Sequence, residues 1–142
     1  MMFRKIAAVL LGVAVAVAIV AAVEALGHAV YPVPADIDFN DPVRFQEYVS
    51  GLPAGAFLFV LGSWVLGTLI GGLLACFVAR ERPFLYAMIV GGAILATTVV
   101  NLIIIPHPLW FSATAVIAIA IVSYLTGLIA SSLPYAQGKE SS

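Results

Sequence analysis

A glutamate and a histidine stand four residues apart in the first long apolar stretch of the chain. At this spacing Glu24 and His28 share one helix face, and Tyr31 continues that face one turn further on. Ionisable side chains inside a membrane are costly unless they are paired or face a wet cavity, so they mark candidate functional sites. A carboxylate beside an imidazole can bind an ion or exchange a proton. We therefore expect a ligand- or proton-binding site around this pair.

Further polar side chains map to the same half of the membrane. Asn101 lies about one turn inside the end of the third apolar stretch, and His107 follows that end. Both histidines, the only acid and the only amide of the apolar stretches thus converge on one leaflet. We predict a polar pocket there, lined by Glu24, His28, Tyr31, Trp64, Asn101 and His107.

The same residues support two other interpretations. Imidazole and carboxylate groups are ligands for zinc, copper or iron, so Glu24, His28 and His107 are candidate metal ligands, and a haem between the two histidines is a further option. Alternatively, Glu24, His28 and Asn101 only join the first and third spans by hydrogen bonds, which contribute ~0.6 kcal/mol each on average in membranes. Residue types alone leave the ligand site, the metal site and the interhelical tie open.

The segment between the first two apolar stretches is acidic and offers a second pattern. Four oxygen-bearing side chains match positions one, three, five and twelve of an EF-hand calcium loop: Asp36, Asp38, Asn40 and Glu47. The pattern departs from the template where Asp41 replaces the glycine of the sharp turn. A helix start is the simpler explanation, with Asp41 as N-cap and Pro42 at the first helical position. We expect a short helix that ends near Ser50.

Several classes of function lack their sequence signals. The 142 residues carry a net charge of −1, which offers no basic surface to nucleic acid. The single cysteine, Cys76, can form no disulfide within the chain. The sequence contains no glycine-rich phosphate loop, Gly-x-Ser-x-Gly elbow or His-Glu-x-x-His motif. It favours a protein that is not an enzyme, with no catalytic residues and no cofactor apart from the metal option above.

The elements that must position these side chains are membrane-spanning helices. Hydrophobic residues make up 63% of the chain and charged residues only 9%, too few to cover the surface of a soluble domain. A helix needs about 20 mainly apolar residues to span a bilayer. Four stretches qualify, at about 6–31, 54–78, 84–105 and 110–133, with an outer loop at 32–53. We predict an all-α fold, a single transmembrane four-helix bundle with a short helix in that loop.

Positive charges predict the orientation of the bundle. Positively charged loops stay on the cytoplasmic side. In a four-span arrangement Arg44 alone falls on one side, and the other five basic residues fall on the opposite side: Arg4, Lys5, Arg80, Arg82 and Lys139. Both termini are therefore expected inside, and the predicted pocket opens to the outside.

Small residues at four-residue spacing run along the predicted spans. Gly67, Gly71 and Ala75 form such a stripe in the second span, and Gly92 with Ala96 in the third. Small side chains let helix backbones approach closely in lipid, where no hydrophobic effect drives helices together. The stripes suit packing within one bundle, and they suit a homo-oligomer or a membrane-protein partner as well.

The chain resembles small four-helix bacterial inner-membrane proteins that have no assigned activity. The resemblance spans most of the chain and is carried by Glu24-x-x-Gly27-His28-x-x-Tyr31-Pro32-x-Pro34, Asn101 and His107-Pro108-x-Trp110. It implies a bacterial inner membrane and no particular function. The residues themselves predict a membrane protein that binds or transports a small ligand or ion. The alternative is a structural or accessory subunit that docks a membrane partner or self-assembles, and a metal-binding membrane protein is a third hypothesis.

Overall fold

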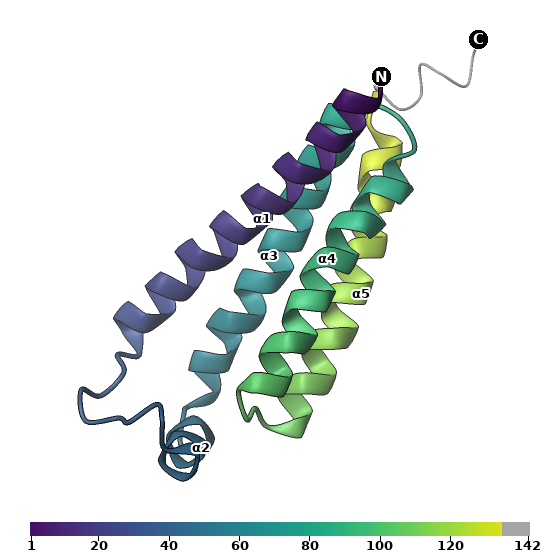
Figure 1. The fold of residues 1–142 in the computed structure, drawn as a ribbon. Coiled ribbons are helices and arrows are strands. Elements are labelled where there is room, and N and C mark those ends of the chain that lie inside the picture. The colour runs from purple at the N-terminus through teal and green to yellow at the C-terminus, as the bar shows by residue number, and fades with distance from the viewer. Residues whose placement is uncertain (135–142) are drawn as a thin grey trace.

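The structure, a computed structural model, describes residues 1–134 and consists of helices and their connections (Figure 1). The helices are α1 (Met2–Val30), α2 (Pro42–Ser50), α3 (Ala54–Ala79), α4 (Pro83–Ile104) and α5 (Leu109–Ser132). The all-α prediction is confirmed, and the long helices match the four predicted spans. The largest difference is at the start of the first span, which begins at Met2 rather than near residue 6. Lys139, used above to predict orientation, lies outside the described residues.

The four long helices are apolar and long enough to cross a membrane. The shortest, α4, has 22 residues, which corresponds to about 33 Å of helix against a hydrocarbon layer of ~30 Å. Large apolar side chains on their outer faces, such as Leu10, Ile103 and Ile121, are exposed. Such faces are stable in lipid and costly in water. Length, composition and exposure together indicate an integral membrane protein.

The predicted small-residue stripe of the second span packs against α1. A Cβ atom at Gly67 would lie 2.8 Å from the carbonyl oxygen of Ala16, and one at Gly12 would lie 2.7 Å from the Cβ of Ala75. Gly71 also faces the α1 backbone, at Gly12 and Ala16. The backbones of α1 and α3 therefore touch over two turns, an approach that only small residues permit.

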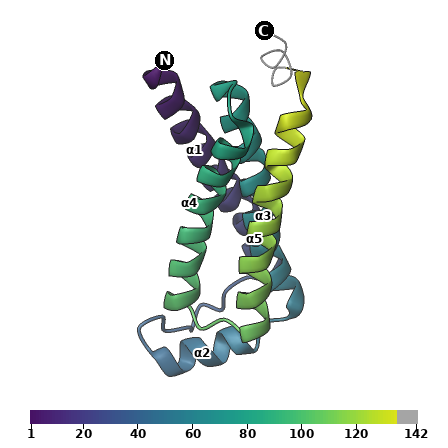
Figure 2. The same cartoon turned by 90° about the vertical axis from the view of Figure 1, so that its right-hand side faces the viewer.

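Helices α1 and α4 converge toward one end of the bundle and separate toward the other (Figure 1). α1 packs mainly on α3, and α5 packs on α3 and α4. Near the middle of the bundle α1 meets α4, where Gly12 faces Val90. Further along, α1 leans away from α4 (Figure 1). The end at which they separate is crossed by the α1–α3 connection and by α2 (Figure 2).

The short helix α2 starts as the loop sequence predicts. The Asp41 side chain accepts hydrogen bonds from the backbone N–H groups of Val43, at 3.0 Å, and Arg44, at 3.3 Å. This is the N-cap arrangement, with Pro42 at the start of the helix. Val49 of α2 is buried, and Phe45 and Tyr48 are partly buried against the core, so the helix is held on the bundle through its apolar side.

The converging end of the bundle carries basic residues. The Lys5 ammonium lies 2.8 Å from the Glu81 carboxylate, which joins the start of α1 to the α3–α4 turn. Arg80 and Arg82 flank Glu81 in that turn, both with a left-handed backbone conformation. The start of α1 and the α3–α4 turn thus lie at the same end, as an even number of crossings between them requires.

Candidate functional site

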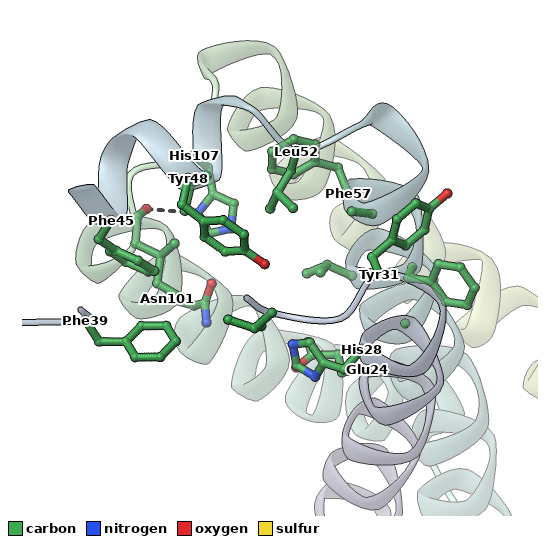
Figure 3. Close-up of a pocket in the computed structure, with 17 residues that line it drawn as sticks. Glu24, His28, Tyr31, Phe39, Phe45, Tyr48, Leu52, Phe57, Asn101 and His107 are labelled. Carbon is green, nitrogen blue, oxygen red and sulfur yellow. Dashed lines mark hydrogen bonds between the residues drawn. The ribbon is translucent and has the colours of Figure 1, made fainter. Parts of the chain in front are cut away.

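A cavity of about 270 Å³ lies at the diverging end of the bundle. Residues of α1, α3 and α4 line it together with α2 and the loops on either side of α2 (Figure 3). Five of the six residues predicted to form a pocket line this one cavity: Glu24, His28, Tyr31, Asn101 and His107. The lean of α1 creates the space, because α1 and α4 are in contact near Gly12 but separate toward the C-terminal end of α1.

Glu24 projects from α1 with its carboxylate only weakly engaged. Its Oε1 atom accepts a hydrogen bond from the Ser63 hydroxyl at 3.3 Å. The same hydroxyl lies 2.7 Å from the Val60 carbonyl oxygen of its own helix. Because a serine hydroxyl has one proton to donate, the shorter contact takes most of it. The Trp64 indole also interacts with the carboxylate, so Ser63 and Trp64 together leave part of its hydrogen-bonding capacity open to the cavity.

His28 lies one turn beyond Glu24 on the same face of α1, as the sequence spacing predicts (Figure 3). It interacts with the Glu24 carboxylate electrostatically, and its side chain is exposed. The hydrogen bond that joins Glu24 to another helix differs from the one considered from the sequence. Glu24 is joined to Ser63 of α3 rather than to Asn101 of α4.

Asn101 brings an unsatisfied group to the cavity. Its amide oxygen is buried and has no hydrogen-bond partner among the described residues. One turn earlier in α4, the buried hydroxyl oxygen of Thr98 also has no hydrogen-bond partner among the described residues. A buried polar atom without a partner costs about 1–3 kcal/mol, so native proteins usually supply a partner, from a ligand or an ordered water. The Asn101 oxygen is therefore a free acceptor at the cavity wall.

His107 contributes a second acceptor from the α4–α5 turn. Its Nδ1 atom lies 2.9 Å from the Ile105 carbonyl oxygen. A carbonyl oxygen can only accept, so Nδ1 carries the proton, and Nε2 of the neutral ring keeps a lone pair. Burial lowers the pKa of His107 below its usual value of 6.5, which favours this neutral form at pH 7. The ring is stacked on Phe111, with centroids 5.0 Å apart.

Trp64 does not belong to the cavity wall. It is buried, with its ring 5.7 Å from that of Phe111 of α5. Its indole still interacts with the Glu24 carboxylate from the α3 side. The prediction placed it among the lining residues because helix rise gives its depth, but its direction around α3 turns the ring toward α5. Trp64 therefore contacts Glu24 from the side of α3 and α5, outside the cavity lining.

Most of the aromatic wall was not predicted from the sequence. It comes from the loop, α2 and the first turns of α3: Phe39, Phe45, Tyr48, Phe57 and Phe59. The Tyr48 hydroxyl points toward the middle of the lining residues (Figure 3). The Tyr31 hydroxyl turns away toward Gly55. A signal was present in α2, where apolar residues at 45, 48, 49 and 52 recur with helical spacing and so define one face.

The predicted metal ligands do not form a metal centre. Within residues 1–134 no three His, Cys, Asp or Glu side chains come together to hold a metal ion. Glu24 and His28 lie together on α1, whereas His107 lies across the cavity in the α4–α5 turn. Two acidic side chains of the loop accept hydrogen bonds from the backbone instead. The Asp38 carboxylate accepts from the Asn40 N–H group at 2.9 Å, and Asp41 caps α2. Neither the three-residue set nor the calcium loop is assembled.

No protein-family model, no curated protein and no solved structure matches this chain. The assignment of a function therefore rests on the residues and geometry of the cavity.

Proposed function

We propose that this membrane protein binds a small ligand or ion in the cavity around Glu24 and His28, and carries it across or presents it at the membrane. The observation that supports this most strongly is the gathering of polar residues. The only acid within the apolar helices, both histidines and a buried amide oxygen without a partner line one space of about 270 Å³. Polar groups in a bilayer are costly, and a wet cavity with a ligand compensates that cost.

In this proposal the cavity faces outward from a bacterial inner membrane, with both termini in the cytoplasm. The positive-inside tendency supports the orientation, since Arg4, Lys5, Arg80 and Arg82 lie at the end away from the cavity. Labelling of single introduced cysteines in intact cells tests it. Residue 38 in the acidic loop should react with a membrane-impermeant maleimide, and residue 81 should not react.

Binding is tested by filling the cavity without touching its polar residues. Ala56 of α3 lines the cavity, whereas Ala54, half a turn earlier, is exposed and does not line it. A ligand that binds only the folded protein raises its stability, by about 2.7 kcal/mol at 100 times Kd. Wild type, Ala56→Phe and the control Ala54→Phe are purified in nanodiscs and melted with a panel of ions and small organic compounds.

We expect at least one compound to stabilise wild type and Ala54→Phe but not Ala56→Phe. A panel that shifts the melting temperature of all three proteins equally would contradict the proposed function. Flux of the stabilising compound into liposomes then separates transport from binding alone.

One observation favours the second candidate, a subunit that self-assembles or docks a partner. The stripe of Gly92 and Ala96 on α4 packs on no other helix within residues 1–134, because a Cβ atom at Gly92 would meet nothing within 4 Å and Ala96 is exposed. Small-residue stripes are common helix contacts in lipid. Crosslinking of wild type and Gly92→Leu in membranes tests it. Loss of crosslinked species only in the variant would support assembly through this face.

A further inference from the structure

The carboxylate of Glu24 has no lysine or arginine partner among the described residues that line the cavity. Glu24 is also the only acidic residue among the described residues of the lining. The ion pairs found in the described part of the chain, Lys5 with Glu81 and Arg44 with Asp41, lie elsewhere. His28 interacts with the Glu24 carboxylate electrostatically, and its side chain is exposed. Glu24 therefore has no lysine or arginine countercharge at the cavity within the described part of the chain.

Two further polar atoms of the wall are hydrogen-bond acceptors. The Asn101 amide oxygen is buried without a partner. His107 uses its Nδ1 proton on the Ile105 carbonyl and keeps only a lone pair at Nε2. Together with the Glu24 carboxylate, these groups give a cavity rich in acceptors. A ligand that satisfies these three acceptors brings N–H or O–H groups, and the Tyr48 hydroxyl in the same lining can donate as well as accept.

The rest of the wall is largely apolar, with aromatic side chains beside aliphatic ones such as Val33, Leu52 and Ile105. Tyr31 and Phe59 meet edge to face at 6.1 Å on the α1–α3 side, and Phe39 and Phe45 do so at 5.7 Å on the α2 side. The face of an aromatic ring carries negative charge and attracts cations. The same rings give an apolar surface to the body of a ligand. Carboxylate, lone pairs and ring faces thus all favour the same sign of charge.

We infer that the ligand of this cavity is a small organic cation, a protonated amine on a compact apolar body. The inference rests on the proposed function and names its ligand class. The ammonium donates to the Glu24 carboxylate and the Asn101 oxygen, and the apolar body lies against the aromatic wall. A bare metal ion fits less well, because hard cations take several oxygen ligands and no set of three acidic, histidine or cysteine ligands forms in the described chain.

The size of the cavity limits the ligand. Its volume of about 270 Å³ falls just below the usual range of about 300–1,000 Å³ for small-molecule sites. A single ring with a short aminoalkyl chain is of this size. The probe we choose is 2-phenylethylammonium, with the neutral 2-phenylethanol and the anionic phenylacetate as compounds of similar shape and different charge.

The experiment is calorimetric titration of the three probes into the full chain in nanodiscs. Wild type should bind the ammonium at least ~10-fold more tightly than the alcohol, since a desolvated, hydrogen-bonded charge pair contributes this much or more. Glu24→Gln should remove that preference. Glu47→Gln makes the same change of charge on an exposed residue of α2 outside the lining, and should leave the preference unchanged.

A second variant guards against loss of folding in Glu24→Gln. Glu24→Asp keeps the charge but withdraws it by one methylene, so ammonium binding should weaken several-fold while the preference over the alcohol remains. Ammonium affinity that is unchanged in both Glu24 variants overturns the inference.

The failure of this inference differs from that of the proposed function. Equal binding of ammonium and alcohol, or tighter binding of phenylacetate, overturns the organic cation but leaves a ligand site that Ala56→Phe would still block. Absence of binding for all three probes also overturns the cation. The cavity itself is rejected only when no compound of the broader panel distinguishes Ala56→Phe from Ala54→Phe.

Discussion

The Ser63 hydroxyl of α3 donates to the Glu24 carboxylate of α1 at 3.3 Å, across 39 positions of sequence. This contact joins the two helices at the floor of the cavity, but the proton is shared with the Val60 carbonyl at 2.7 Å. The contact therefore places Glu24 beside the cavity without using up its capacity to bind. The predictions below follow from this arrangement and from the packing around it.

Ser63→Ala should have a small effect on stability. An interhelical hydrogen bond in a membrane protein contributes ~0.6 kcal/mol on average, and this one is long and shared. We expect a loss of less than ~1 kcal/mol in the free energy of unfolding, measured in mixed micelles. A loss of several kcal/mol would mean that the Ser63 contact, rather than backbone packing, holds α1 on α3.

Gly71→Ala should destabilise the bundle strongly for so small a change. A methyl group at this position would lie 2.7 Å from the Ala16 Cβ and would also meet the Gly12 backbone. Overpacking of this kind typically costs about 1–3 kcal/mol. The same measurement of unfolding in mixed micelles tests it.

The matched control is Gly62→Ala in the same helix, where a Cβ atom meets nothing within 4 Å. Alanine is favoured over glycine inside a helix by about 0.5–1 kcal/mol. We therefore expect Gly62→Ala to be neutral or stabilising, whereas the same substitution at Gly71 lowers the free energy of unfolding. Equal effects at both sites would contradict the close α1–α3 packing.

Asp41→Ala should destabilise the short helix α2, which lines one side of the cavity, without unfolding the bundle. Removal of an N-cap side chain costs about 0.5–2 kcal/mol of helix stability, and α2 has only 9 residues. Amide hydrogen exchange over 42–50 should become faster, while exchange in α3 stays unchanged. Asp36→Ala, which removes an exposed acid from the same loop, is the control. Equal acceleration by both variants would show that net charge matters rather than the cap.

His107 should make stability depend on pH. Burial lowers its pKa below 6.5 in the folded chain, so the unfolded chain binds more protons in the window just below that value. Stability from this residue is therefore complete above about pH 6.5 and declines as the pH falls toward the folded-state pKa. The melting temperature of wild type should drop between about pH 7.5 and pH 5. His107→Gln should reduce that drop, and an identical pH profile would refute the assignment.

The sequence alone determines the four spans and the short helix α2. Apolar stretches of sufficient length must form helices in lipid, since each backbone polar group has to be satisfied within its own segment. The start of α2 is also local, because Asp41 and Pro42 act on the backbone next to them. The convergence of Glu24, His28, Asn101 and His107 on one end followed from depth along the helices.

Only the tertiary structure decides which faces meet. A helix in lipid is apolar on all sides, so periodicity does not separate its packed face from its lipid face, and a small-residue stripe does not name its partner. The glycines at 67 and 71 pack on α1, whereas Gly92 stays open. The lean of α1, the aromatic wall from α2, the unpartnered Asn101 oxygen and the turn of Trp64 toward α5 all arise from contacts between distant segments. Because of these contacts, the polar residues line a cavity instead of forming hydrogen bonds with one another.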